Sequence, residues 1–77
     1  MRMENLRQLR EKADLTRDEL ANLSGVLSTT IRNHELGLVK GTSEATEQAL
    51  AKALNVPVQA LFFASNMEIS IIQEANV

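Results

Sequence analysis

The chain contains no cysteine, and this absence excludes both a disulfide framework and a thiolate metal site. Tryptophan and tyrosine are also absent, Phe62 and Phe63 are the only aromatic residues, and Pro57 is the only proline. The other apolar side chains come from Leu, Ala, Ile, Val and Met, a composition typical of packed helices rather than of sheets. We therefore expect an all-α fold.

Long apolar runs are missing as well. No stretch approaches the roughly 20 apolar residues needed to cross a bilayer, and the first residues alternate charge with Met and Leu. Because nothing favours an oxidising compartment either, the sequence predicts a cytoplasmic protein without a membrane partner. Its 77 residues suffice for one small domain.

The net charge of −2 argues against a protein that holds nucleic acid by bulk electrostatics alone. The charges are unevenly distributed, however. Residues 1–40 hold seven of the eight basic side chains, whereas residues 41–77 hold only Lys52 against four glutamates. If there is a polyanionic partner, the first half of the chain should face it.

Apolar spacing and capping residues predict the first three helices. Residues 3–13 carry an apolar stripe at helical spacing that leaves Arg7 and Arg10 for solvent. Thr16 and Glu19 form a capping-box pattern that begins a second helix, whose expected inner face consists of Leu20, Ala21 and Leu23. Gly25 supplies the positive φ that a sharp turn requires. A third helix is expected over residues 28–36, ended by Gly37.

Two further helices complete the expected architecture, a compact five-helix bundle. Thr42 or Ser43 can cap a fourth helix that Asn55 ends, and Pro57 can begin a short fifth one. The expected core face of the fourth helix consists of Ala45, Ala49, Leu50, Ala53 and Leu54.

Two short amphipathic helices joined at a glycine, over residues 15–37, are the pattern of a helix-turn-helix. A helix of this diameter fits the major groove of B-DNA, where base edges carry a distinguishable hydrogen-bonding code. Residues 5–63 resemble the helix-turn-helix domain of phage repressors, Cro-like proteins and related small bacterial regulators. The resemblance rests on Leu6-Arg7, Leu9-Arg10, Leu15-Thr16, Glu19-Leu20-Ala21, Gly25-Val26, Ile31, Glu35, Gly37, the segment Ala51-Lys52-Ala53-Leu54-Asn55-Val56, and Leu61-Phe62.

The resemblance implies roles for individual positions. Base-contacting side chains of the family correspond here to Ser28, Thr29, Arg32 and Asn33. Phosphate-contacting positions correspond to Arg17 and Lys40. The chemistry of these residues suits the roles, because Arg pairs with guanine, Asn with adenine, and Ser or Thr with either kind of base edge.

Other residues in this region have plainer interpretations. His34 is the only histidine and occupies an inward position, so we expect a packed histidine rather than a metal ligand. Glu35 has no base, nucleophile or metal partner beside it, and a structural hydrogen bond or ion pair is expected. Leu27 stands where the family has a capping Ser or Thr, so Ser28 could cap the helix instead. No enzyme site or cofactor is indicated.

The segment 65–77 lies outside the expected domain of residues 1–64. Its Met67, Ile69 and Ile71 alternate with polar residues as in a half-buried strand, although a helical spacing of four is present too. Self-association through this segment, packing on its own domain and contact with another protein all stay open.

The leading hypothesis is a sequence-specific DNA-binding transcriptional regulator of phage or prokaryotic type, acting as a homodimer on double-stranded operator DNA. The alternative is a protein-binding module on the same fold, an anti-repressor or an antitoxin-like protein that grips a repressor or toxin. The residues expected to contact such a partner, or the second copy of a dimer, are Leu27, Met67, Ile69 and Ile71.

Overall fold

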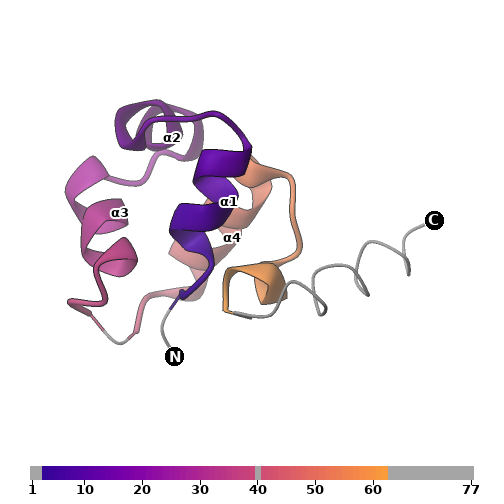
Figure 1. Cartoon of the computed structure of the whole chain (residues 1–77). Coiled ribbons are helices and arrows are strands. Elements are labelled where there is room, and N and C mark those ends of the chain that lie inside the picture. The colour runs from indigo at the N-terminus through magenta and orange to yellow at the C-terminus, as the bar shows by residue number, and fades with distance from the viewer. Residues whose placement is uncertain (1–2, 40, 63–77) are drawn as a thin grey trace.

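The computed structural model describes residues 3–39 and 41–62. These residues form helices α1 Leu6–Lys12, α2 Arg17–Ser24, α3 Ser28–Glu35 and α4 Glu44–Leu54, followed by the 3-10 turn η1 Val58–Leu61. The described ranges contain no strand, in agreement with the all-α expectation. Figure 1 shows α1 in front of α4, α2 at one end of the bundle, and α3 on the side away from η1.

The expected count of five helices is wrong. The described residues form four α-helices, and the fifth expected helix is the single turn η1. Asn55 takes a left-handed conformation with φ 58° and ends α4, and Pro57, which caps η1, has an extended backbone. The Phe62 N–H then bonds back to the Gln59 carbonyl at 3.1 Å, a three-residue step typical of a 3-10 turn.

One apolar core joins all five elements. α2 packs against α3 and α4, η1 packs against α4, and α1 packs against α3. A fully buried aliphatic side chain contributes roughly 1.5–3 kcal/mol relative to an exposed one. The buried apolar residues are Met3, Leu6, Leu9, Leu20, Ile31, Leu50, Ala51, Leu54, Ala60 and Leu61.

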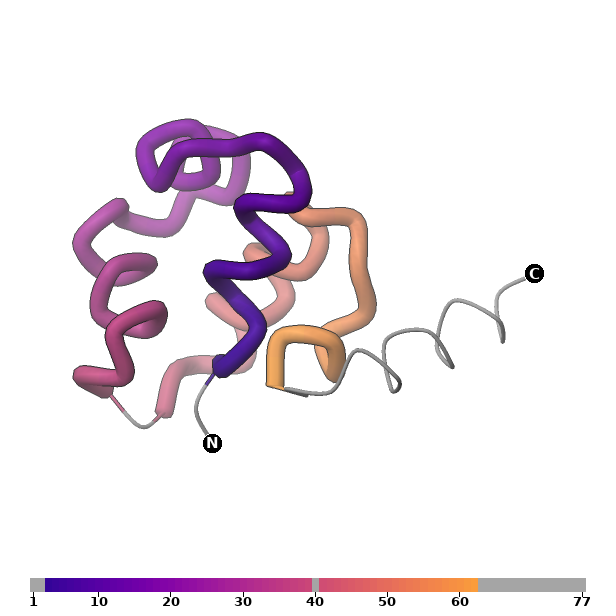
Figure 2. Tube along the Cα trace, in the orientation of Figure 1, coloured from indigo at the N-terminus to yellow at the C-terminus, as the bar shows by residue number. Residues whose placement is uncertain are grey.

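The helix signals in the sequence are confirmed where they are local. Thr16 accepts a hydrogen bond from the Glu19 N–H at 3.1 Å, and the Glu19 side chain accepts one from the Thr16 N–H at 2.8 Å. Gly25 has φ 76°, so the chain bends once between α2 and α3, as the tube in Figure 2 shows. Ser43 rather than Thr42 caps α4.

Three residues expected on core faces are exposed instead, namely Ala13, Leu23 and Ala45. Ala13 is the C-cap of α1 and still donates its N–H to the Leu9 carbonyl, but Asp14 takes a positive φ, so the chain turns away directly after Ala13. Ala45 lies five positions before Leu50, about 140° around the helix from it. Ala51 of α4 is buried, although it was not among the residues expected on the core face of that helix.

A buried asparagine ties the start of the chain to η1. Asn5 is 2% exposed, its side-chain Nδ2 donates to the Ala60 carbonyl at 3.1 Å, and its N–H donates to the Leu61 carbonyl at the same distance.

In the described ranges, no helix combines the length and the apolar character that a membrane crossing requires.

Candidate nucleic-acid interface

The third helix buries one side and presents the other. Ile31 and His34 are buried against the rest of the bundle, which fixes the rotation of α3 about its axis. Because residues one, four and five positions apart share a helix face, the polar side chains gather on the other side. There Thr29 and Arg32 are exposed, and Ser28 and Asn33 are half-buried. The structure thus brings the four base-contacting candidates together on α3.

The beginning of α3 has no side-chain cap. Leu27 occupies the capping position with an extended backbone and is 73% exposed, while Ser28 is the first helical residue. The suggestion that Ser28 caps the helix is therefore wrong. Before the helix, Ser24 Oγ accepts a hydrogen bond from the Val26 N–H at 3.1 Å, which orders the turn instead. The Ser28 hydroxyl is left for another contact.

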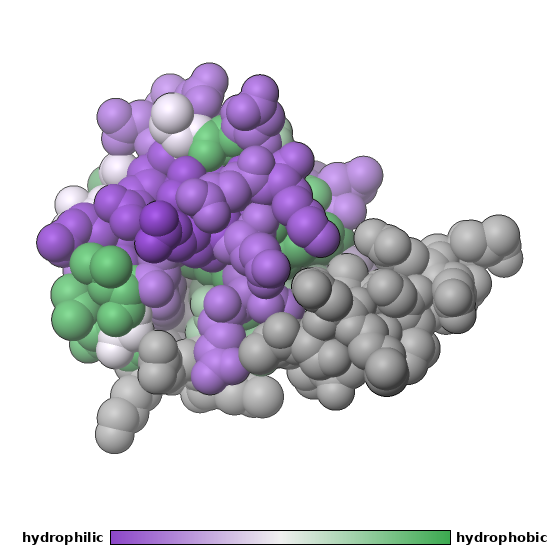
Figure 3. Space-filling view, in the orientation of Figure 1, coloured by the Kyte–Doolittle hydropathy of each residue, from purple (hydrophilic) through white to green (hydrophobic). Residues whose placement is uncertain are grey.

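The end of α3 is closed by a glycine. Gly37 has φ 72°, its N–H donates to the His34 carbonyl, and the Leu38 N–H donates to the Asn33 carbonyl at 2.9 Å. This is the Schellman arrangement, in which the last free carbonyls of a helix are satisfied. Leu36 and Leu38 are exposed there, and Figure 3 shows an apolar patch at that edge of an otherwise mostly hydrophilic face.

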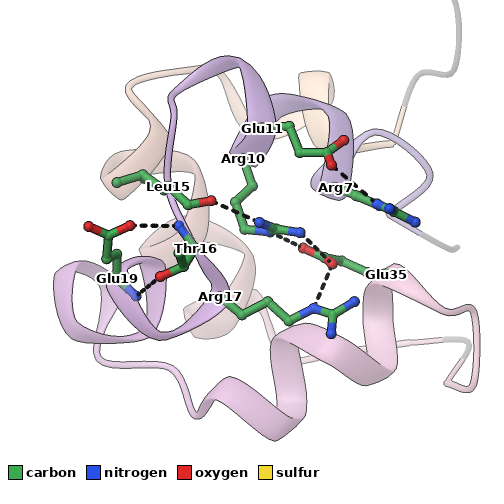
Figure 4. Close-up of polar contacts among 8 residues, drawn as sticks. All are labelled: Arg7, Arg10, Glu11, Leu15, Thr16, Arg17, Glu19 and Glu35. Carbon is green, nitrogen blue, oxygen red and sulfur yellow. Dashed lines mark hydrogen bonds and ion pairs between the residues drawn. The ribbon is translucent and has the colours of Figure 1, made fainter.

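A buried carboxylate joins the first three helices. Glu35, the last residue of α3, has a fully buried side chain. It accepts hydrogen bonds from Arg10 of α1, from Nε at 2.6 Å and Nη2 at 3.1 Å, and from Arg17 Nε of α2 at 2.9 Å. Figure 4 shows the two guanidinium groups on different sides of this carboxylate.

The arginines keep this carboxylate charged. Burial by itself raises the pKa of Glu35, but the hydrogen bonds and charges of Arg10 and Arg17 outweigh burial and hold that pKa below its usual value. The hydrogen bond to Glu35 raises the pKa of Arg10, against the lowering effect of burial. The three side chains are therefore two cations and one anion, and they carry a net charge of +1.

The ion pair expected for Glu35 is confirmed, but its partners were not predicted. Arg10 was expected in solvent, yet its side chain is only 11% exposed, because it reaches across to α3 and its Nη1 also donates to the Leu15 carbonyl at 2.8 Å. The spacing of these residues holds no signal for the pairing, because it depends on how α1 crosses α3, although both residues belong to the pattern that carries the family resemblance. By contrast, Arg7 does lie in solvent, in an exposed pair with Glu11 at 3.5 Å.

Arg17 lines an open hollow between the beginnings of α2 and α3. The hollow is lined by Arg10, Thr16, Arg17, Asp18 and Ser28. The predicted phosphate-contacting arginine thus lies close to Ser28, one of the predicted base-contacting residues. Lys40 and the tail residues Met67, Ile69 and Ile71 lie outside the described residues, as does the expected boundary between 1–64 and 65–77.

Burial also shifts the pKa of His34. The side chain is 5% exposed, which confirms a packed histidine. Burial lowers its pKa below 6.5, and the charge of Glu47 opposes this effect only in part. A neutral imidazole is therefore part of the core at neutral pH.

Comparison with known proteins agrees with this geometry. Residues 6–61, most of the chain, match a family model described as Helix-turn-helix. The chain therefore belongs to the phage-repressor and Cro-like helix-turn-helix family, whose members are DNA-binding transcription regulators. No curated protein and no solved structure matches the chain.

Proposed function

We propose that this protein is a sequence-specific transcriptional regulator of phage or prokaryotic type that places α3 in the major groove of its operator. The observation that carries the proposal is the two-sided character of α3. Ile31 and His34 anchor the helix, while Thr29 and Arg32 are exposed on its outer side. A helix held in this way can enter a groove without disturbing the core.

Each polar side chain on the outer side of α3 has a defined partner in this proposal. Arg32 donates two hydrogen bonds to O6 and N7 of a guanine, and Asn33 pairs with N6 and N7 of an adenine. Ser28 and Thr29 bond a neighbouring base edge or contact a thymine methyl. Arg17 and Lys40 bind phosphates and set the orientation of the domain without contributing sequence information.

The proposed active form is a homodimer. Two copies of α3 would then contact half-sites about 34–36 Å apart, one turn of B-DNA. The uneven charge distribution supports contact with DNA through the first half of the chain, because residues 1–40 hold seven of the eight basic side chains. Since the net charge is −2, binding should depend strongly on the few arginines and lysines at the interface and weaken steeply with salt.

The test measures binding to the promoter DNA next to the protein's own gene, at several salt concentrations. Arg32→Ala should lower affinity for that DNA about 5- to 150-fold, the range for one lost bidentate base contact. Arg7→Ala is the matched control, because it removes the same charge from an exposed position on α1. A wild type without salt-dependent and sequence-selective binding contradicts the proposal.

A second candidate function is favoured by Leu27, whose large apolar side chain is 73% exposed beside the polar side of α3. A protein partner, such as a repressor or toxin, would bury it together with Met67, Ile69 and Ile71 of the tail. In this case, a defined partner should bind the wild type but not Leu27→Ser or Ile71→Glu. DNA binding that survives both substitutions, with no such partner, favours the regulator.

A further inference from the structure

In the cluster of Arg10, Glu35 and Arg17, only one of the three charged side chains has substantial solvent exposure. The side chains of Arg10 and Glu35 are 11% and 0% exposed, whereas that of Arg17 is 33% exposed. The net charge of +1 is therefore presented to solvent mainly through Arg17. This arginine is the first residue of α2, where free backbone N–H groups also favour an anion.

The two arginines differ in how many of their nitrogens are used. All three guanidinium nitrogens of Arg10 donate hydrogen bonds, Nε and Nη2 to the Glu35 carboxylate and Nη1 to the Leu15 carbonyl. Arg17 donates only from Nε, to the Glu35 carboxylate at 2.9 Å. Its two terminal nitrogens point away from the carboxylate in Figure 4 and have no hydrogen-bond partner among residues 3–39 and 41–62.

We propose that Glu35 is a positioning residue for DNA binding, which holds Arg17 by Nε so that Nη1 and Nη2 present a paired donor edge to one phosphate. The inference rests on the proposed function. A guanidinium can do this because its donors are fixed in one plane and match phosphate oxygens two at a time. Glu35 occupies the Nε side and leaves the other edge available.

This arrangement links the DNA backbone contact to the base-contacting helix. Glu35 is the last residue of α3, so a phosphate bound at Arg17 is separated from α3 by a single buried carboxylate. An anchored arginine also loses less conformational freedom on binding than a free one. The Asp18 carboxylate beside the hollow opposes any loosely held anion, so precise placement of the Arg17 donors matters.

Lysine at position 17 distinguishes positioning from simple charge. Its ammonium has three donors but no planar fork, so it cannot bond Glu35 and also present two parallel donors to one phosphate. If Glu35 positions the contact, Arg17→Lys should therefore behave like Arg17→Gln. If only an exposed positive charge matters, Arg17→Lys should behave like the wild type.

The experiment measures the affinity of the full chain for a 20-base-pair duplex of random sequence, from low to moderate salt. Phosphate contacts do not depend on sequence, so the operator need not be known. Arg17→Gln and Arg17→Lys should both reduce the slope of log affinity against log salt by about 0.9, the value for one phosphate contact. Arg7→Gln and Arg7→Lys, which alter the exposed pair with Glu11, should leave the slope unchanged.

A second measurement follows the Arg17 Nε–H by NMR in the free protein, where slow exchange with solvent is expected. Three results would each overturn this inference and leave the regulator proposal standing. Two are a wild-type salt slope in Arg17→Lys and a wild-type salt slope in Arg17→Gln. The third is rapid solvent exchange of the Arg17 Nε–H in the free protein. A wild type that binds neither the random duplex nor the promoter DNA overturns both. Because Arg17 is partly exposed, these variants test the inference without removing the Arg10–Glu35 pair.

Discussion

At the scale of single residues, two ion pairs whose arginines lie on the same helix differ in how far they are exposed to solvent. The Arg10–Glu35 pair is nearly withdrawn from solvent, while Arg7 and Glu11 are 61% and 56% exposed. A buried charge without its partner bears the full cost of lost hydration, whereas exposed pairs contribute little. The stability of the domain should therefore depend on Arg10 far more than on Arg7, although the two arginines lie on the same helix.

Arg10→Met tests this difference. The substitution keeps much of the apolar length of the side chain but leaves Glu35 with Arg17 alone and frees the Leu15 carbonyl. We expect a loss of about 3 kcal/mol in the free energy of unfolding, measured with urea. The control Arg7→Met should change it by no more than about 0.5 kcal/mol. Equal losses in the two variants would contradict the assigned burial.

At the scale of the helical elements, Gly25 is required by backbone conformation rather than by space. It has φ 76°, and a Cβ built at this position meets no atom within 4 Å. Gly25→Ala should therefore cost about 1 kcal/mol of stability, the strain of a left-handed residue with a side chain. Gly41→Ala is the matched control, since its space is equally open and its φ is not in the left-handed region. A neutral result at position 25 in thermal unfolding is incompatible with this explanation.

The uncapped beginning of α3 gives a prediction of the opposite sign. Leu27 is largely exposed and supplies no hydrogen bond, so Leu27→Ser sacrifices little buried surface and adds a side-chain cap. We expect a gain of about 1 kcal/mol in unfolding free energy. Leu27→Ala, which adds no cap, should show no such gain in the same urea titration. Equal stability of the Ser and Ala variants would contradict the prediction that a side-chain cap at position 27 stabilises α3.

The same elements explain what could be predicted from the sequence. The capping box at Thr16 and the turn at Gly25 depend on residues close together in the chain, so their signals are complete in the sequence. The burial of Arg10 and Asn5 depends instead on partners at positions 35 and 60, brought near by helix crossings. For the candidate site, the polar side of α3 was therefore predictable. The carboxylate that joins Arg10 and Arg17 to it was not.

At the scale of the whole molecule, two buried titratable groups make stability depend on pH in the same direction. The pKa of His34 is lowered by burial, so the unfolded chain takes up this proton first and stability falls as pH drops below about 6.5. The pKa of Glu35 is lowered in the fold, because its arginine partners outweigh burial. Its contribution is present above the unfolded pKa and is lost as pH falls through the folded value.

Urea unfolding between pH 8 and pH 3 should therefore show two losses of stability, an earlier one from His34 and a later one to which Glu35 contributes. His34→Leu should abolish the earlier loss, because it removes the proton uptake while keeping an apolar side chain in the core. It should leave the later loss in place, since Glu35 and its arginines are unchanged. The control Gln59→Leu alters an exposed position on η1 and should preserve both losses. If His34→Leu follows the wild-type profile between pH 7 and pH 5, the histidine is not the group that destabilises the fold in mild acid.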